Sequence, residues 1–218
     1  MTAVLFDLDG TLLDTARDMA TAMNALRAEA SLPPLPFESV RPYVSHGATA
    51  MVRLGFPQLP EPQFNLLRDR FLILYRDCLA EETQLFAGMP ELLGALELAG
   101  IPWGIVTNKP TWLTEPLLDA LQLRERAGSL VCGDTFPERK PHPRPLLHAA
   151  AELAVAPESC LFIGDAERDI KAARAAQMRA LVARFGYIGP ADRIDEWLAD
   201  GCIDSPLEIL DWLTTASS

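Results

Sequence analysis

The chain has few cysteines and histidines, and neither residue type forms a cluster. Its four cysteines are scattered over 218 residues without a CxxC pair, and its three histidines add no pattern that suggests zinc. Disulfide frameworks and structural zinc sites use closely or regularly spaced cysteines, so neither is expected here. Each cysteine lies in or beside an apolar run, and we interpret all four as reduced thiols.

Long apolar stretches are also missing. No run approaches the roughly 18 apolar residues that a membrane-spanning helix requires. The first residues lack the basic segment followed by an apolar stretch that is typical of a secretion signal. We therefore expect no membrane partner, and we place the protein in the cytoplasm by default.

Basic residues are fewer than acidic residues in this chain. The chain has 19 Lys and Arg residues against 30 Asp and Glu residues, which gives a formal net charge of -11. This balance argues against general nucleic-acid binding and against anionic membrane surfaces. The hydrophobic fraction of 49% and the charged fraction of 22% are typical of a packed globular protein. We expect a monomer or weak dimer that acts on a small molecule.

Short apolar runs alternate with segments of helical length. The helical segments carry apolar residues at steps of three and four, as in residues 92–99, 113–121, 146–153 and 170–176. This alternation predicts an α/β fold, with a parallel sheet flanked by helices. The expected strands are residues 3–6, 101–106, 129–132, 160–163 and 180–183.

Residues 15–83 break this alternation, because they contain helical spacing but no convincing buried strand. Residues 19–30 and 64–78 each carry an apolar stripe with helical periodicity, and a shorter helix is expected over residues 40–54. We therefore predict a helical domain, residues 15–83, inserted into a catalytic core formed by residues 1–14 and 84–218.

Polar residues gather directly after three of the expected strands. Ligands bind at the carboxyl ends of parallel strands, so these segments are the first candidates for a site. Lys140-Pro141 lies between the second and the third of them. The three segments are Asp7-Leu8-Asp9-Gly10-Thr11, Thr107-Asn108-Lys109 and Gly164-Asp165-Ala166-Glu167-Arg168-Asp169.

These segments and Lys140-Pro141, taken in order, resemble the four motifs of the haloacid dehalogenase-like (HAD) hydrolase superfamily, in its phosphatase branch. The resemblance implies a Rossmann-like core with a helical cap inserted after the first motif. It also implies that Asp7 attacks phosphorus to form an aspartyl phosphate. Asp9 would protonate the leaving oxygen and then activate water.

The resemblance further implies a Mg²⁺ cofactor. Asp7, the main-chain carbonyl of Asp9 and Asp165 match the ligands of the family, and carboxylate and carbonyl oxygens suit this ion. Asp169 would act on the metal directly or through water. Alternatively, Asp169 is an acidic residue that stabilises the first turn of the following helix.

Four residues are expected to hold the phosphate. Thr107 and Asn108 would donate hydrogen bonds to it, and Gly10 lets the backbone approach an anion closely. Lys140 would offset charge on both the phosphate and Asp7. Lys109 is left open between a surface charge and a substrate contact.

The inserted segment is expected to choose the substrate. Ser45-His46-Gly47 is the preferred specificity loop, and His46 and Arg53 are the candidate substrate contacts. A cap that closes over the core would bring such groups to the part of the substrate that carries no phosphate.

Several functions stay open on the sequence alone. The helical insertion and the fourth motif resemble phosphoglycolate phosphatases, so a phosphatase acting on a 2-phosphoglycolate-like metabolite is expected first. Residues 88–92, 106–110 and 185–188 also resemble bacterial phosphatases that act on N-acetylmuramic acid 6-phosphate in cell-wall recycling. A sugar phosphomutase and a non-catalytic binding protein are further alternatives. A haloalkanoate dehalogenase is disfavoured because Asp9 supplies the second carboxylate that phosphate chemistry requires.

Overall fold

The computed structural model describes residues 1–214, and its centre is a six-stranded sheet in which every neighbouring pair is parallel. The strand order is β5-β4-β1-β6-β7-β8, so β1 lies between β4 and β6, where the order of connection reverses. The α/β fold class with a Rossmann-like sheet is thereby confirmed. The strands are β1 (Ala3–Phe6), β4 (Trp103–Val106), β5 (Ser129–Val131), β6 (Cys160–Gly164), β7 (Arg179–Ala183) and β8 (Gly201–Ile203).

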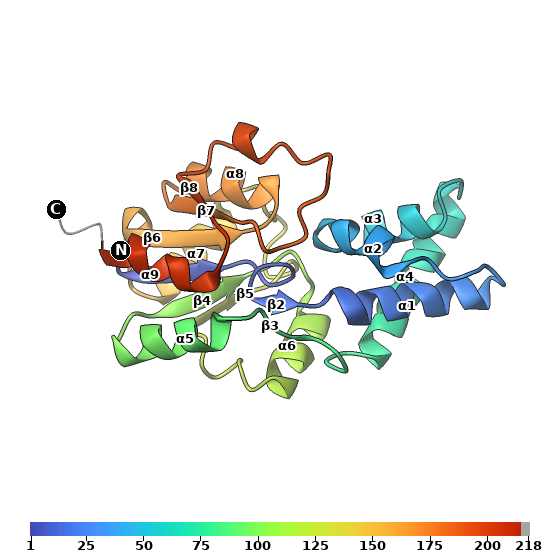
Figure 1. Ribbon diagram of the computed structural model, residues 1–218, viewed down its shortest axis with the longest axis horizontal. Helices are drawn as coiled ribbons and strands as arrows, with labels where there is room; N and C mark the ends of the chain where they lie inside the picture. Colours follow the sequence, from blue (N-terminus) through green and yellow to red (C-terminus); the bar gives the residue numbers. More distant parts are fainter. Residues whose placement is uncertain (215–218) are drawn as a thin grey trace.

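Helices cover both faces of this sheet (Figure 1). One face packs against α5 (Met89–Leu98), α6 (Thr111–Ala120) and α9 (Ile209–Thr214), and the other against α7 (Arg144–Glu152) and α8 (Glu167–Ala175). Because side chains alternate along a strand and both faces are buried, the strands read as continuous apolar runs. Three short 3₁₀ helices complete the core: η2 (Pro157–Ser159), η3 (Ile194–Glu196) and η4 (Pro206–Glu208).

A separate group of helices lies beyond one end of the sheet (Figure 1). We call residues 16–77 the helical unit. It has its own apolar core, built largely from α1 and α4. Its elements are α1 (Ala16–Glu29), α2 (Phe37–Val40), the 3₁₀ helix η1 (Arg41–His46), α3 (Gly47–Gly55) and α4 (Glu61–Asp77).

The chain enters and leaves the helical unit at one place. There β2 (Leu13–Asp14) and β3 (Gln84–Leu85) form a two-stranded antiparallel sheet. Asp18, near the start of α1, accepts hydrogen bonds from the backbone N–H groups of Glu82 and Thr83 and from the Thr83 hydroxyl. The two connections are therefore held together.

The structure differs from the sequence expectations in its short elements. The helix expected over residues 40–54 is divided into η1 and α3 at Gly47, whose φ of +74° is incompatible with a continuous helix. Strands β2, β3 and β8 and helix α9 were not predicted, because elements this short show no clear periodicity. Within residues 1–214, the helices are too short or too polar for one to span a membrane.

Candidate active site

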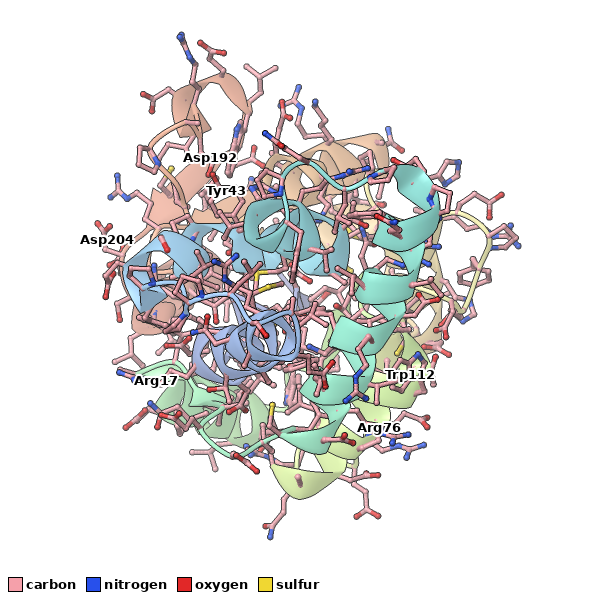
Figure 2. All side chains as sticks on the ribbon, turned by 90° about the vertical axis from the view of Figure 1, so that its right-hand side faces the viewer. Arg17, Tyr43, Arg76, Trp112, Asp192 and Asp204 are labelled. Carbon is pink, nitrogen blue, oxygen red and sulfur yellow. The ribbon has the colours of Figure 1, made fainter. Side chains whose placement is uncertain are left out.

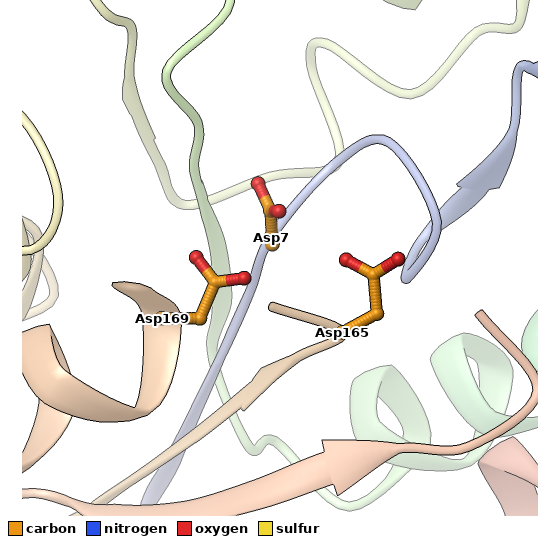
Figure 3. A group of neighbouring side chains, drawn as sticks. All are labelled: Asp7, Asp165 and Asp169. Carbon is orange, nitrogen blue, oxygen red and sulfur yellow. The ribbon is translucent and has the colours of Figure 1, made fainter. Parts of the chain in front are cut away.

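Three carboxylates converge at the carboxyl end of the central strands (Figure 3). Asp7 follows β1, Asp165 follows β6, and Asp169 lies in the first turn of α8. One oxygen from each carboxylate lies within 4.8 Å of the others, and all three residues are buried. The predicted metal ligands Asp7, Asp165 and Asp169 are thus brought together by parallel strand pairing and a tight strand-to-helix turn.

This crowding favours the protonated carboxylic acids. Burial and the charge of Asp169 raise the pKa of Asp7 from 3.8 to about 6, against the opposing charges of Lys140 and Arg168. Burial, Asp7 and Asp169 raise the pKa of Asp165 to about 7. Oδ1 of Asp165 is buried and has no hydrogen-bond partner within residues 1–214. Clustered carboxylates with a free oxygen are a donor set that fits a hard divalent cation such as Mg²⁺.

Lys140 lies beneath the cluster as its buried countercharge. Its Nζ atom is 2.8 Å from Oδ1 of Asp7 and 2.7 Å from Oδ1 of Asp169, and its side chain is 1% exposed. Asn108 fixes this segment, because its amide accepts a hydrogen bond from Lys140 N (3.1 Å) and donates one to Lys140 O (3.0 Å). Asn108, a predicted phosphate ligand, also lines the cavity described below, and its amide holds the Lys140 segment in place.

Asp9 has different surroundings from Asp7. Its Oδ1 atom accepts hydrogen bonds from the Thr15 hydroxyl (2.7 Å) and from Nζ of Lys109 (2.9 Å). The Asp9 carbonyl, which was expected to bind the metal, is 3.3 Å from the Ser45 hydroxyl. Asp7 therefore belongs to the carboxylate cluster, whereas Asp9 is paired with Lys109.

Gly10 makes the close packing of this loop possible. Its φ is +83°, and a Cβ atom at this position would lie 2.0 Å from Oδ2 of Asp165. The sequence suggested that Gly10 lets the backbone approach an anion. In the structure the nearest anion is the Asp165 carboxylate, so a side chain at position 10 would displace Asp165 from the carboxylate cluster.

A cavity of about 550 Å³ lies between the core and the helical unit. The core contributes a polar floor with Asp7, Asp9 and Thr107, whereas Asp165, Asp169 and Lys140 do not line the cavity. The opposite wall comes from α3 and α4. Other lining residues include Val44, His46, Gly47, Arg68, Leu72, Tyr75, Asn108, Lys109, Trp112, Leu113, Asp134, Arg139 and Arg168.

Two cations at this site, Lys109 and Arg168, were not assigned a role from the sequence. Lys109 is buried, and its Nζ atom lies between Asp9 and the Tyr75 hydroxyl, 2.8 Å from the latter. Nη2 of Arg168 donates to the carbonyl of Ser45 at 2.6 Å and lies 3.9 Å from Oδ2 of Asp7. The available signal was their position: Lys109 directly follows the second motif, and Arg168 lies between the two acidic residues of the fourth.

The two substrate contacts expected in the insertion are placed differently. His46 lines the cavity, and burial and the nearby Arg168 lower its pKa, which favours the neutral imidazole at neutral pH. Arg53 does not line the cavity. Its guanidinium lies 3.9 Å from the Phe64 ring centroid and pairs with Glu61.

The model of the haloacid dehalogenase-like hydrolase family matches residues 4–183. The chain belongs to the haloacid dehalogenase-like hydrolases. The family predicted from the four motifs is thereby confirmed, and with it the expectation of a hydrolytic enzyme.

Relatives of this HAD hydrolase are named for two different substrates. The chain is 45% identical to the N-acetylmuramic acid 6-phosphate phosphatase of Pseudomonas aeruginosa, over 98% of this chain and 95% of the relative. It is also 45% identical to a phosphoglycolate phosphatase of Xanthomonas campestris, over 95% and 94%. The crystal structure of a predicted phosphoglycolate phosphatase from Haemophilus somnus superposes with a TM-score of 0.86, at 28% identity and 97% coverage of both chains.

Proposed function

We propose that this HAD hydrolase is a Mg²⁺-dependent phosphatase that works through an aspartyl phosphate on Asp7. The observation that carries the proposal is the buried cluster of Asp7, Asp165 and Asp169 with Lys140, at one edge of a cavity of substrate size. Phosphoryl transfer requires mainly positioning and the neutralisation of oxygen charge, and this cluster is suited to both.

Asp7, Asp165 and the Asp9 carbonyl are the proposed metal ligands. Both carboxylate oxygens of Asp169 are already engaged, one by Lys140 and the other by the backbone N–H of Ala166. We therefore assign Asp169 to orienting Lys140 and to contacts with the metal through water. A bound Mg²⁺ would supply charge neutralisation for the phosphoryl oxygens and for Asp7.

The other catalytic roles are assigned to side chains of the protein. Asp7 attacks phosphorus while Asp9 gives a proton to the leaving oxygen, and Asp9 later takes a proton from the water that releases phosphate. Lys140, Arg168 and the Thr107 hydroxyl offset the negative charge that gathers on the transferred group.

We further propose that residues 15–83 act as a cap that moves about the β2–β3 connection. The helical unit forms one wall of the cavity, so its position decides whether water reaches the phosphoenzyme. Tyr187, in the loop after β7, accepts hydrogen bonds from the backbone N–H groups of Thr15 and Ala16 and donates one to Asp14. These contacts fix the connection on the core side.

For the substrate, we favour a hexose-sized phosphate monoester such as N-acetylmuramic acid 6-phosphate. A cavity of about 550 Å³ lies in the range of roughly 300–1,000 Å³ that holds drug-sized ligands. A two-carbon acid would leave most of it unfilled. Trp112, which Figure 2 labels beside α4, is 42% exposed and offers an indole to the face of a sugar ring.

2-Phosphoglycolate, the substrate expected first from the sequence, is the second candidate. The relative from Xanthomonas campestris that carries this name is as similar to the chain as the one named for the sugar phosphate. A panel of phosphate monoesters, assayed with Mg²⁺ by release of inorganic phosphate, tests both candidates. Transfer of phosphate to a second sugar hydroxyl instead of to water would indicate a phosphomutase.

Activity is expected to disappear when the metal is removed. Exhaustive chelation should lower phosphate release at least about 100-fold, because the charge of three clustered carboxylates then opposes the phosphate. Adding Mg²⁺ back should restore the rate. Asp165→Asn should raise the Mg²⁺ concentration that gives half-maximal activity, whereas Asp119→Asn, on the exposed surface of α6, should not. Full activity after chelation would contradict the metal assignment.

Trp112→Ala is expected to separate the two substrates. If the indole packs on a sugar ring, the variant should lose about 10-fold in kcat/KM for N-acetylmuramic acid 6-phosphate. Its kcat/KM for 2-phosphoglycolate should change less than about twofold, because that molecule does not reach the indole. If wild type and Trp112→Ala had equal kcat/KM for the sugar phosphate, Trp112 would not be a substrate contact.

A further inference from the structure

The Asp9 carboxylate is held by one of its two oxygens. Oδ1 accepts hydrogen bonds from the Thr15 hydroxyl and from Lys109, whereas Oδ2 receives none from any group within residues 1–214. Asp9 lines the cavity. The two oxygens of this carboxylate are therefore not equivalent: Oδ1 is fixed by the protein, and Oδ2 is available.

Lys109 is the charged member of this arrangement. Its side chain is 5% exposed, and a buried ammonium group requires strong partners. The structure provides two of them, Oδ1 of Asp9 at 2.9 Å and the Tyr75 hydroxyl at 2.8 Å. The Lys109 backbone N–H also donates to the Thr107 hydroxyl, so the lysine is anchored at both ends.

Tyr75 comes from the helical unit, not from the core. It lies in the last turns of α4 and is buried. Burial and the nearby carboxylates raise its pKa well above 10.0, so its hydroxyl stays neutral and accepts the hydrogen bond from Lys109. A contact chain thus runs from α4 through Lys109 to Asp9.

We propose that Lys109 is a positioning residue for Asp9, and that Tyr75 makes this positioning depend on where the helical unit lies. Lys109 and Thr15 hold Oδ1, so that Oδ2 faces the cavity and exchanges the proton. When α4 lies over the core, Tyr75 fixes the ammonium group, and displacement of α4 releases it. This inference rests on the proposed function, because it concerns the residue proposed there as acid and base.

The step that depends on this positioning is the departure of the leaving group. The bond between phosphorus and the leaving oxygen breaks as the bond from Asp7 to phosphorus forms, and the proton moves from Oδ2 of Asp9 to the leaving oxygen. An alkyl alcohol requires this proton, whereas p-nitrophenolate leaves readily as the anion. The ratio kcat/KM covers only the steps up to this departure, so it isolates the proton donor from the later hydrolysis.

The experiment compares kcat/KM of Lys109→Met on N-acetylmuramic acid 6-phosphate and on p-nitrophenyl phosphate. A displaced acid should lower the value for the sugar phosphate about 100-fold and the value for the aryl phosphate less than about fivefold. Lys109→Arg should restore part of the loss, because it keeps the charge. Lys171→Met, an exposed lysine on α8, is the matched control and should leave both values unchanged.

Tyr75→Phe gives a second variant that removes one oxygen and preserves the ring packing. It should show the same substrate dependence at a smaller size, about 3- to 10-fold on the sugar phosphate. The inference would be overturned if Lys109→Met and Tyr75→Phe each lost as much kcat/KM on the aryl phosphate as on the sugar phosphate. It would also be overturned if neither variant lost kcat/KM on either substrate. A wild-type enzyme that hydrolyses no ester of the phosphate monoester panel, 2-phosphoglycolate included, or an Asp9→Asn variant with full turnover, would instead overturn the proposed function and the inference with it.

Discussion

Replacement of Asp7 by asparagine is expected to lower kcat by about 10⁴-fold or more. The amide has nearly the size of the carboxylate but is a poor nucleophile toward phosphorus, so the covalent route is closed. Folding should be preserved. Asp7 is one of three crowded carboxylates, and Lys140 keeps its second partner, Asp169, in the variant.

Two measurements check this expectation. Steady-state hydrolysis of the preferred ester gives the loss in kcat, and thermal unfolding with Mg²⁺ chelated shows whether the fold is intact. Wild-type protein that is quenched in acid during turnover should carry phosphate on Asp7, and Asp7→Asn should carry none. Turnover by Asp7→Asn within tenfold of wild type, with a normal unfolding temperature, would be incompatible with a nucleophilic Asp7.

The residues at the strand ends could be predicted because they depend on local order in the sequence. Asp7 and Asp165 directly follow apolar runs, and parallel pairing of β1 with β6 brings such residues to the same edge. Lys140 follows no strand, and its recognition depended on the family motif. Its burial and its double ion pair were visible only in three dimensions.

The wall of the cavity could not be predicted in the same way. Lys109 and Tyr75 are far apart in the sequence, and their contact depends on how the helical unit packs on the core. A stripe of apolar residues at helical spacing indicates which face of a helix is buried, but not which residues that face contacts. For this reason the sequence did not indicate a function for Tyr75, and it could not decide whether Lys109 is a surface charge or a substrate contact.

The contrast between His46 and Arg53 has a simple geometric cause. His46 ends η1 at the cavity, and of α3 only the first residues, Gly47 to Thr49, line it. Arg53 lies six residues after Gly47, which is roughly 9 Å further along the helix axis at 1.5 Å per residue. Its guanidinium therefore reaches Phe64 and Glu61 in place of the cavity.

The metal-free protein is expected to be more stable in mild acid than in mild alkali. The folded-state pKa values of about 6 for Asp7 and about 7 for Asp165 lie above the ordinary value of 3.8. The folded state therefore keeps protons that the unfolded state has already released. This contribution to the free energy of unfolding is fully present below about pH 4 and is lost as the pH rises through 6 and 7.

Urea unfolding at pH 5 and pH 8, with a chelator and with excess Mg²⁺, measures this effect. With the chelator, wild-type protein should lose stability between pH 5 and pH 8, and Asp165→Asn should lose less, because only Asp7 of the two raised carboxylates is then left to ionise in this range. Mg²⁺ should restore stability at pH 8, since the ionised cluster binds the cation more tightly than the protonated one. If wild type and Asp165→Asn had the same pH dependence without metal, the cluster would not be the source of the effect. A Mg²⁺ stabilisation that Asp165→Asn retained in full would place the cation at another site.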